Sequence, residues 1–220
     1  MLGETVISST ITYREYAEAE GSESRQYYTV LAMSFLLIFM FTLLYFNVQP
    51  HPKDHAFRRS RFFGTSVMIL NKWLGMTLLM IGVSIKMVVE AVAESKTMSD
   101  FSNTLLTRAV GASMILLLLS RLCHFGGRVP SSTTPTQVQW LMRLWWVLFA
   151  VVSLIPFFLP DLSHPIASLG CVSCLIFVFV GVESWFSHCL EDYLPGGEKS
   201  TDDEQSSLTE TPSVPGYASF

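Results

Sequence analysis

Charged side chains are scarce in this sequence: Asp, Glu, Lys and Arg make up 15% of its 220 residues, while 50% of the residues are hydrophobic. A soluble domain carries about 25% charged residues, so this composition, with a mean hydropathy of +0.41, argues against an ordinary water-soluble domain. The net charge is −4, and much of the acidic charge lies near the two ends. No basic footprint of the kind that binds nucleic acid stands out, so we expect no nucleic-acid partner.

The sequence also lacks the motifs that mark common catalytic and metal sites. It contains no Gly-rich phosphate loop, no Ser, His and Asp set in a recognisable context, and no ligand cluster with the spacing of a metal site. We therefore expect no enzymatic activity, no cofactor and no bound metal. An Asn-x-Ser/Thr acceptor for glycosylation is absent as well.

Cysteine is rare, with four in the chain. Cys171 and Cys174 lie three residues apart within an apolar run. Without an accessible thiolate pair or further ligands, we interpret them as small packing residues rather than a redox or zinc site. Cys123 and Cys189 fall at predicted membrane edges, which makes them candidates for reversible palmitoylation.

What the sequence does contain is a series of long apolar runs. A helix of about 20 apolar residues crosses about 30 Å of hydrocarbon. Five runs reach this length, at 27–47, 65–90, 104–123, 140–159 and 166–187. The sequence therefore predicts an all-α fold, a polytopic transmembrane helical bundle of about five spans over residues 27–190. A polar leader (1–26) precedes it, and an acidic tail (191–220), rich in Ser, Thr and Pro, is expected to be disordered.

Basic residues in the short loops predict the orientation, because such loops resist translocation. The loop after the first run carries Lys53, Arg58, Arg59 and Arg61. The loop after the third carries Arg121 and Arg128, with Arg143 just inside the next run. The other two loops hold a single Lys between them. We therefore expect an integral membrane protein in the lipid bilayer, with its N-terminus outside and its C-terminal tail in the cytoplasm.

The second apolar run carries a polar stripe. At about 100° per residue, one third of the helix circumference holds Asn71, Gly75, Gly82, Lys86 and Glu90. Lipid offers no partners to polar groups, so this stripe is expected to face neighbouring helices. Two interpretations of Lys86 and Glu90 remain open: charges at the outer membrane interface, or members of a polar cavity or permeation path. A salt link to Arg108 fits both.

Three further charges lie within predicted spans. Arg108 and Arg121 are separated by about 20 Å of helix, which is shorter than the hydrocarbon, and we expect both to reach water by snorkelling from opposite ends rather than to be buried. Glu183 lies near the inner end of the last run. It is interpreted either as an interfacial acid or as a proton-handling group.

Part of the chain resembles a known family of membrane proteins. The chain begins "MLGETVIS", in which Leu2, Gly3 and Glu4 match the end of a family pattern that starts E-R-H-G-L-F and ends L-G-E. Further on, "FTLLYFNVQP" is similar to a family helix that ends in an aromatic pair, here Tyr45 and Phe46. In "DHAFRRSRFFG" the residues that match the family's basic loop are His55, Arg58 and Arg59.

Over residues 1–95 the sequence thus resembles the C-terminal half of the low temperature requirement A (LtrA-like) family. The resemblance implies a multi-span membrane protein, which we expect to have transporter or channel-like activity. It also implies a missing N-terminal half as a partner. A homo-oligomer is the other partner that we expect. The alternative is a structural or assembly protein that recruits a cytoplasmic partner through its tail.

Overall fold

A computed structural model describes residues 22–48, 56–93, 97–125, 136–160, 162 and 164–190. The predictions for most of the leader and for the tail 191–220 fall outside these residues. The same holds for four residues that carry the family resemblance, Leu2, Gly3, Glu4 and His55.

The described chain is helical and contains no strand. Its long helices are α2 (Ser22–Val48), α4 (Arg61–Ala93), α5 (Asp100–Phe125), α6 (Thr136–Leu154) and α7 (Pro165–Leu190). Two short elements join them, α3 (Ala56–Arg59) and the 3-10 helix η2 (Ile155–Phe158). Five helices are long and apolar enough to cross a membrane, which confirms the predicted all-α bundle with five candidate spans.

The fourth predicted run, 140–159, covers α6 and η2 together. Pro156 stands in the first turn of η2, where the α-helix gives way to the tighter 3-10 geometry. Proline has no N–H and cannot continue the α-helical hydrogen-bond ladder, so the change of helix type falls where the sequence places the proline. The span Thr136–Phe158 nevertheless remains long enough to cross a membrane.

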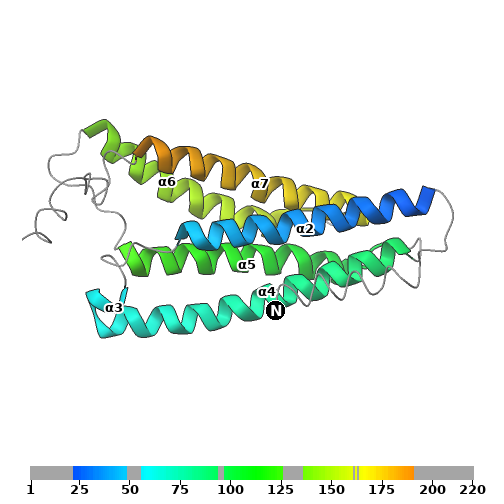
Figure 1. The fold of residues 1–220 in the computed structure, drawn as a ribbon, viewed down its shortest axis with the longest axis horizontal. Coiled ribbons are helices and arrows are strands. Elements are labelled where there is room, and N and C mark those ends of the chain that lie inside the picture. The colour runs from blue at the N-terminus through cyan, green and yellow to red at the C-terminus, as the bar shows by residue number, and fades with distance from the viewer. Residues whose placement is uncertain are drawn as a thin grey trace, which may run out of the picture.

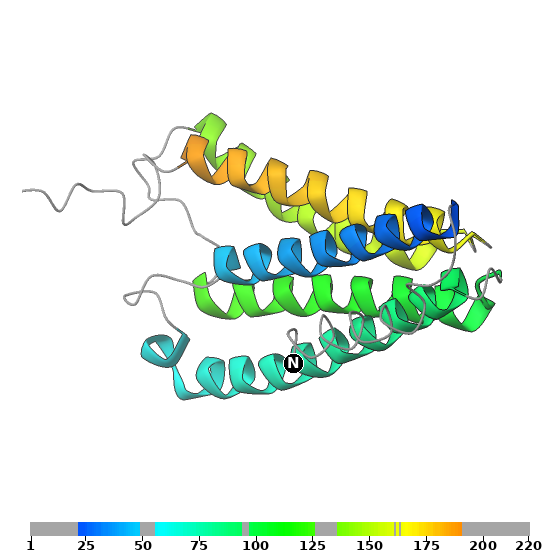
Figure 2. The ribbon, with the colours of Figure 1, turned by 45° about the vertical axis from the view of Figure 1, so that its right-hand side comes forward.

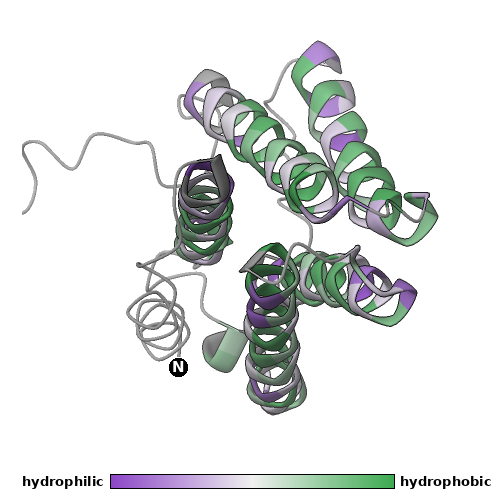
Figure 3. Ribbon diagram, turned by 90° about the vertical axis from the view of Figure 1, so that its right-hand side faces the viewer, coloured by the Kyte–Doolittle hydropathy of each residue, from purple (hydrophilic) through white to green (hydrophobic). Residues whose placement is uncertain are grey.

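Consecutive long helices run in opposite directions, so α2, α5 and α7 point one way and α4 and α6 the other (Figure 1). The helices that pack most closely are α4 with α5 and α2 with α7, and α6 with η2 packs against α5; Figure 3 views this arrangement along the bundle. The helices diverge toward the end of the bundle that carries α3 and converge at the opposite end (Figure 2). We refer to these as the α3 end and the far end.

Aromatic rings fill the space between α6 and α7 on the α3 side. The ring centroids of Trp145 and Phe149, both on α6, are 4.9 Å apart. Phe179 on α7 lies 4.7 Å from the Phe149 centroid, and Phe186 lies 5.8 Å from that of Trp145. All four side chains are buried. These rings occupy the space between the two helices at this end of the bundle.

The outward surface of the bundle is also apolar. Large hydrophobic side chains are exposed along the helices, among them Phe35, Phe39, Met76, Val83, Leu144 and Val151. Such a surface is far more apolar than that of a soluble monomer, and it suits lipid contact. Because hydrocarbon solvates apolar side chains, helix association in lipid depends on close packing and polar contacts rather than on the hydrophobic effect.

Replacement of Phe149 by Ala is expected to lower the free energy of unfolding by on the order of 3 kcal/mol, because the ring is fully buried and its loss leaves a cavity. Thermal unfolding of the purified protein in detergent measures this. The matched control is Phe158→Ala, since the Phe158 side chain is 83% exposed and its removal leaves no cavity. Equal destabilisation by the two substitutions would contradict the described core.

Candidate functional site: a buried ion pair

Helix α5 carries polar side chains into the interior of the bundle. Its buried polar residues are Ser102, Asn103, Thr107, Ser113, Ser120, Arg121 and His124. At about 100° per residue they fall on two faces of the helix. One face holds Ser102, Ser113, Ser120 and His124, and the other holds Asn103, Thr107 and Arg121.

The first of these faces contacts α4 and α3. The Ser113 hydroxyl donates a hydrogen bond of 2.8 Å to the Thr77 hydroxyl near the middle of α4. At the α3 end, Nδ1 of His124 accepts a hydrogen bond of 3.3 Å from the backbone N–H of Ala56, the first residue of α3. The short helix α3 is thereby attached to the end of α5.

The second face contacts α7 at both ends of the bundle. At the far end, Oδ1 of Asn103 accepts a hydrogen bond from the Ser168 hydroxyl. Near the α3 end, Nη1 of Arg121 donates to Oε1 of Glu183, and the two form an ion pair. Two polar contacts, 18 residues apart on α5, therefore fix α5 and α7 side by side.

The ion pair is enclosed by the protein. The side chains of Arg121 and Glu183 are 2% and 0% exposed, respectively. Arg121 lies four residues before the end of α5, which is about 6 Å of helix. The pair is therefore near the membrane boundary expected at the α3 end, but it is shielded by neighbouring helices.

Aromatic side chains of α6 surround the cation of this pair. The guanidinium carbon of Arg121 lies 4.7 Å from the Trp145 ring centroid and 6.0 Å from that of Trp146. A guanidinium within about 6 Å of an indole face gains about 0.5–2 kcal/mol from the ring quadrupole. Arg121 thus has two kinds of stabilising neighbour, a carboxylate on α7 and two indoles on α6.

The carboxylate of the pair is less well satisfied than the guanidinium. Oε2 of Glu183 is buried and has no hydrogen-bond partner in the described part of the chain. A buried polar atom without a partner costs about 1–3 kcal/mol, and more when it carries charge. One carboxylate oxygen is therefore paired with Arg121, and the other is available to a proton or a hydrogen-bond donor.

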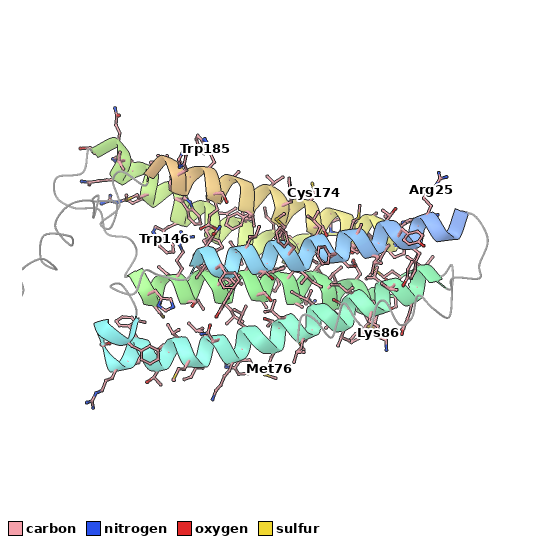
Figure 4. All side chains as sticks on the ribbon, in the orientation of Figure 1. Arg25, Met76, Lys86, Trp146, Cys174 and Trp185 are labelled. Carbon is pink, nitrogen blue, oxygen red and sulfur yellow. The ribbon has the colours of Figure 1, made fainter. Side chains whose placement is uncertain are left out.

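The polar stripe predicted on α4 lies on the outer surface of the bundle, away from the ion pair. Asn71, Lys86 and Glu90 are exposed, so the prediction that this face packs against neighbouring helices is wrong for these three residues. Nζ of Lys86 lies 3.6 Å from Oε1 of Glu90, and their side chains are 55% and 48% exposed. Lys86 projects away from the bundle (Figure 4).

The inward face of α4 is instead apolar. Its buried side chains include Leu74, Ile81, Ile85, Val88 and Val92. These residues pack against the core more closely than a face with two charges would, which is the physical reason for the rotation of the stripe outward. Within the stripe, Gly82 alone is buried, and Gly75 is half-buried.

The two arginines of α5 have different environments, although both were expected to snorkel. Arg108 is exposed, and none of the ion pairs found among the described residues includes it. The expected salt link from Glu90 to Arg108 is not among these ion pairs, and Glu90 pairs with Lys86 instead. Arg121 is buried, so the snorkelling interpretation is wrong for this residue, and Glu183 is buried beside it near the inner end of the last span.

The remaining candidates are scattered. Cys171 and Cys174 are exposed on α7, so they do not pack inside the described bundle as predicted; Figure 4 shows Cys174 on the outer side of α7. Cys123 is half-buried, and the side chain of Cys189 lies outside the described residues. Palmitoylation of either stays a prediction.

Two of the residues that carry the family resemblance have described side chains. The rings of Tyr45 and Phe46 meet edge to face on α2, with centroids 5.8 Å apart. Arg58 and Arg59 lie on α3, and their side chains are not described. Neither Tyr45 nor Phe46 is a member of the ion pair.

No family model matches the chain, and neither the curated proteins nor the solved structures contain a match. In the described ranges, no three His, Cys, Asp or Glu side chains are grouped closely enough to hold a metal ion. The Arg121 and Glu183 pair, with Trp145 and Trp146, is therefore the candidate functional site.

A double-mutant cycle measures the energy of the pair. Glu183→Ala or Arg121→Ala alone is expected to lower the free energy of unfolding by about 3–5 kcal/mol, because each leaves a buried charge without its partner. Replacement of both residues by Ala is expected to cost less than the sum of the two single substitutions, since no unpaired charge remains. Thermal or denaturant unfolding in detergent gives the three values.

The exposed pair on α4 is the matched control for this cycle. Lys86→Ala and Glu90→Ala are each expected to change the free energy of unfolding by less than about 1 kcal/mol, as exposed ion pairs usually do. Additive effects at Arg121 and Glu183, or equal effects in the two pairs, would contradict the buried contact.

Proposed function

We propose that this chain is a multi-pass integral membrane protein with transporter or channel-like activity, and that Arg121 and Glu183 form its functional centre. The five apolar helices supply the membrane-crossing scaffold. The proposal includes membership of the LtrA-like family, which the sequence resembles, and an orientation with the α3 end toward the cytoplasm. The basic residues after the first span support this orientation.

The buried ion pair is the observation that carries the proposal. Ionisable residues inside membrane-spanning helices are costly, and where they occur they commonly mark ion pathways or proton relays. Glu183 and Arg121 lie on different spans, 62 residues apart in the sequence, so a change in their contact would move α5 relative to α7. A pair placed in this way couples a charge event to a helix displacement.

The charged residues on α4 and on the outer face of α5 are weaker candidates for a functional centre than the buried ion pair. Lys86, Glu90 and Arg108 are exposed on the outside of the described bundle. A path that they line would have to lie between this chain and a second protein chain. They serve better as controls for the loss of charge at Arg121 and Glu183.

A structural or assembly protein is the second candidate, and one observation favours it. The polar contacts of α5 with α4, α3 and α7 hold the helices of the bundle together. An ion pair between Arg121 and Glu183, which has no net charge, suits this structural role as well. In this alternative the tail recruits a cytoplasmic partner and the bundle has no flux. Neither candidate involves enzymatic chemistry or a cofactor.

Flux measurements test the proposed function. The full chain is reconstituted in liposomes, and currents are recorded on a solid-supported membrane after steps in Na⁺, K⁺, Cl⁻ and H⁺ concentration. We expect a current with at least one of these ions. It should fall to the level of empty liposomes with Glu183→Gln and with Arg121→Gln, because each substitution removes one of the paired charges, and it should persist with Glu90→Gln and Arg108→Gln.

An exchange of the two charges separates the candidates. The combined substitutions Arg121→Glu and Glu183→Arg restore an ion pair but move the cation away from the α6 indoles. If the pair has only a structural role, we expect the exchanged variant to recover thermal stability, and we expect no current in any variant or in the wild-type protein. The proposed function predicts recovered stability without recovered current. A current that is unchanged in Glu183→Gln would contradict it.

A further inference from the structure

The two oxygens of the Glu183 carboxylate have unequal surroundings, and from this we infer that Oε2 of Glu183 binds a proton that the protein exchanges with the α3 side of the bundle. The inference deepens the proposed function and rests on it for its role in transport, because it makes H⁺ the ion that the site handles. The binding step itself requires no flux.

The first observation is the missing donor at Oε2. Oε1 accepts from Arg121, whereas Oε2 is buried without a hydrogen-bond partner among the described residues. In the ionised carboxylate both oxygens share the negative charge, so part of that charge is held in an apolar site with no donor. A proton on Oε2 removes this charge and is the smallest ligand that can do so in a packed interior.

The second observation is the support of Arg121 by α6. Proton uptake forms an O–H bond at Oε2, weakens the N–H···O contact from Arg121 to Oε1, and changes the net charge of the pair from zero to +1. A buried guanidinium without any partner would forbid this state. Here the Trp145 ring, 4.7 Å away, and the Trp146 ring, 6.0 Å away, keep the cation in place when the carboxylate is neutral.

The third observation concerns the other ionisable groups at this end. From the helices around the pair, these are Cys123 and His124 on α5, His188 on α7, Tyr45 on α2, Arg143 on α6, and Arg61 and Lys72 on α4. Arg61, Lys72, Arg143 and His188 are exposed, and His124 accepts from Ala56. Among the described residues of the α3 end, Glu183 is the one carboxylate.

Tryptophan fluorescence reports on the state of this pair, because Arg121 stacks on two of the five tryptophans. In the full chain, Trp73, Trp140 and Trp185 are replaced by Phe so that Trp145 and Trp146 alone emit. The protein is placed in lipid nanodiscs and titrated from neutral to acidic pH without any ion gradient. We expect one sigmoidal change in emission, as the guanidinium moves relative to the indoles.

Substitutions show which residue is responsible for the change in emission. It should be lost in Glu183→Gln, which cannot take up the proton, and kept in Glu183→Asp. It should also remain in Glu90→Gln, His124→Gln and His188→Gln. A response that persists in Glu183→Gln, or that disappears with either histidine substitution while the protein stays folded, would overturn the inference.

Infrared difference spectroscopy gives a second reading that does not depend on tryptophan. Between neutral and acidic pH, the wild-type protein should gain a C=O band of a protonated carboxylic acid that is absent from Glu183→Gln and present in Glu90→Gln. If Glu183→Gln fails to fold, the band must shift on labelling of glutamate with ¹³C in the wild-type protein but not in Glu183→Asp. Absence of such a band would overturn the inference.

The two proposals fail separately. If the protein carries no current but its fluorescence responds to pH through Glu183, the transport proposal is contradicted and the proton site stands. If the current depends on Glu183 but neither the pH response nor the carboxylic acid band is found, the proton site is contradicted and the transport proposal stands.

Discussion

The contact between the Arg121 guanidinium and the Glu183 carboxylate joins two spans at a place where neither group has access to water. Either charge alone in that environment would be far less stable than in water, so the folded state requires both helices to be present and in register. This requirement fixes the rotation of α5 about its axis. Once α5 is oriented, its other polar face, the one with Ser113 and His124, is turned toward α4 and α3, where these two residues make their contacts.

The polar contacts made by α5 matter because the bundle is surrounded by lipid rather than water. In lipid, apolar side chains gain little by leaving the bilayer, so leucine-rich helices have weak preferences for one another. Hydrogen bonds and tight packing then decide which helix faces meet. In this chain α5 provides the polar contacts to α4 and α7, and the rings of Trp145, Phe149 and Phe179 provide the dense packing between α6 and α7. The exposed apolar residues of the other faces are free to contact lipid.

The number of spans was predictable from the sequence, because length and hydropathy alone determine which segments can cross a bilayer. The candidate site was only partly predictable. Glu183 stood out as an acid in an apolar run, but the sequence contains no sign that its partner is Arg121, 62 residues earlier. The same limit applies to Asn103 and Ser168, whose contact was not anticipated. Pairings between spans depend on helix rotation, which hydropathy does not determine.

The error at Lys86 and Glu90 has the same origin. Their spacing places them correctly on one face of a helix, and they do pair with each other. Which way that face points depends on the competing face, and the run of Ile81, Ile85 and Val88 packs better against the core. An (i, i+4) pair can satisfy its own charges locally and needs no neighbouring helix, whereas a lone charge such as Arg121 must find a partner on another span.

Solid-state NMR tests the central contact most directly. The protein is labelled with ¹⁵N in the arginine side chains and ¹³C in the glutamate carboxylates, reconstituted in lipid bilayers at neutral pH, and the dipolar coupling between the two labels is measured. The ion pair predicts a strong guanidinium to carboxylate coupling that disappears in Glu183→Gln and in Arg121→Lys, and persists in Glu90→Gln. A coupling that is absent from the wild-type protein, or unchanged by Glu183→Gln, would contradict the account.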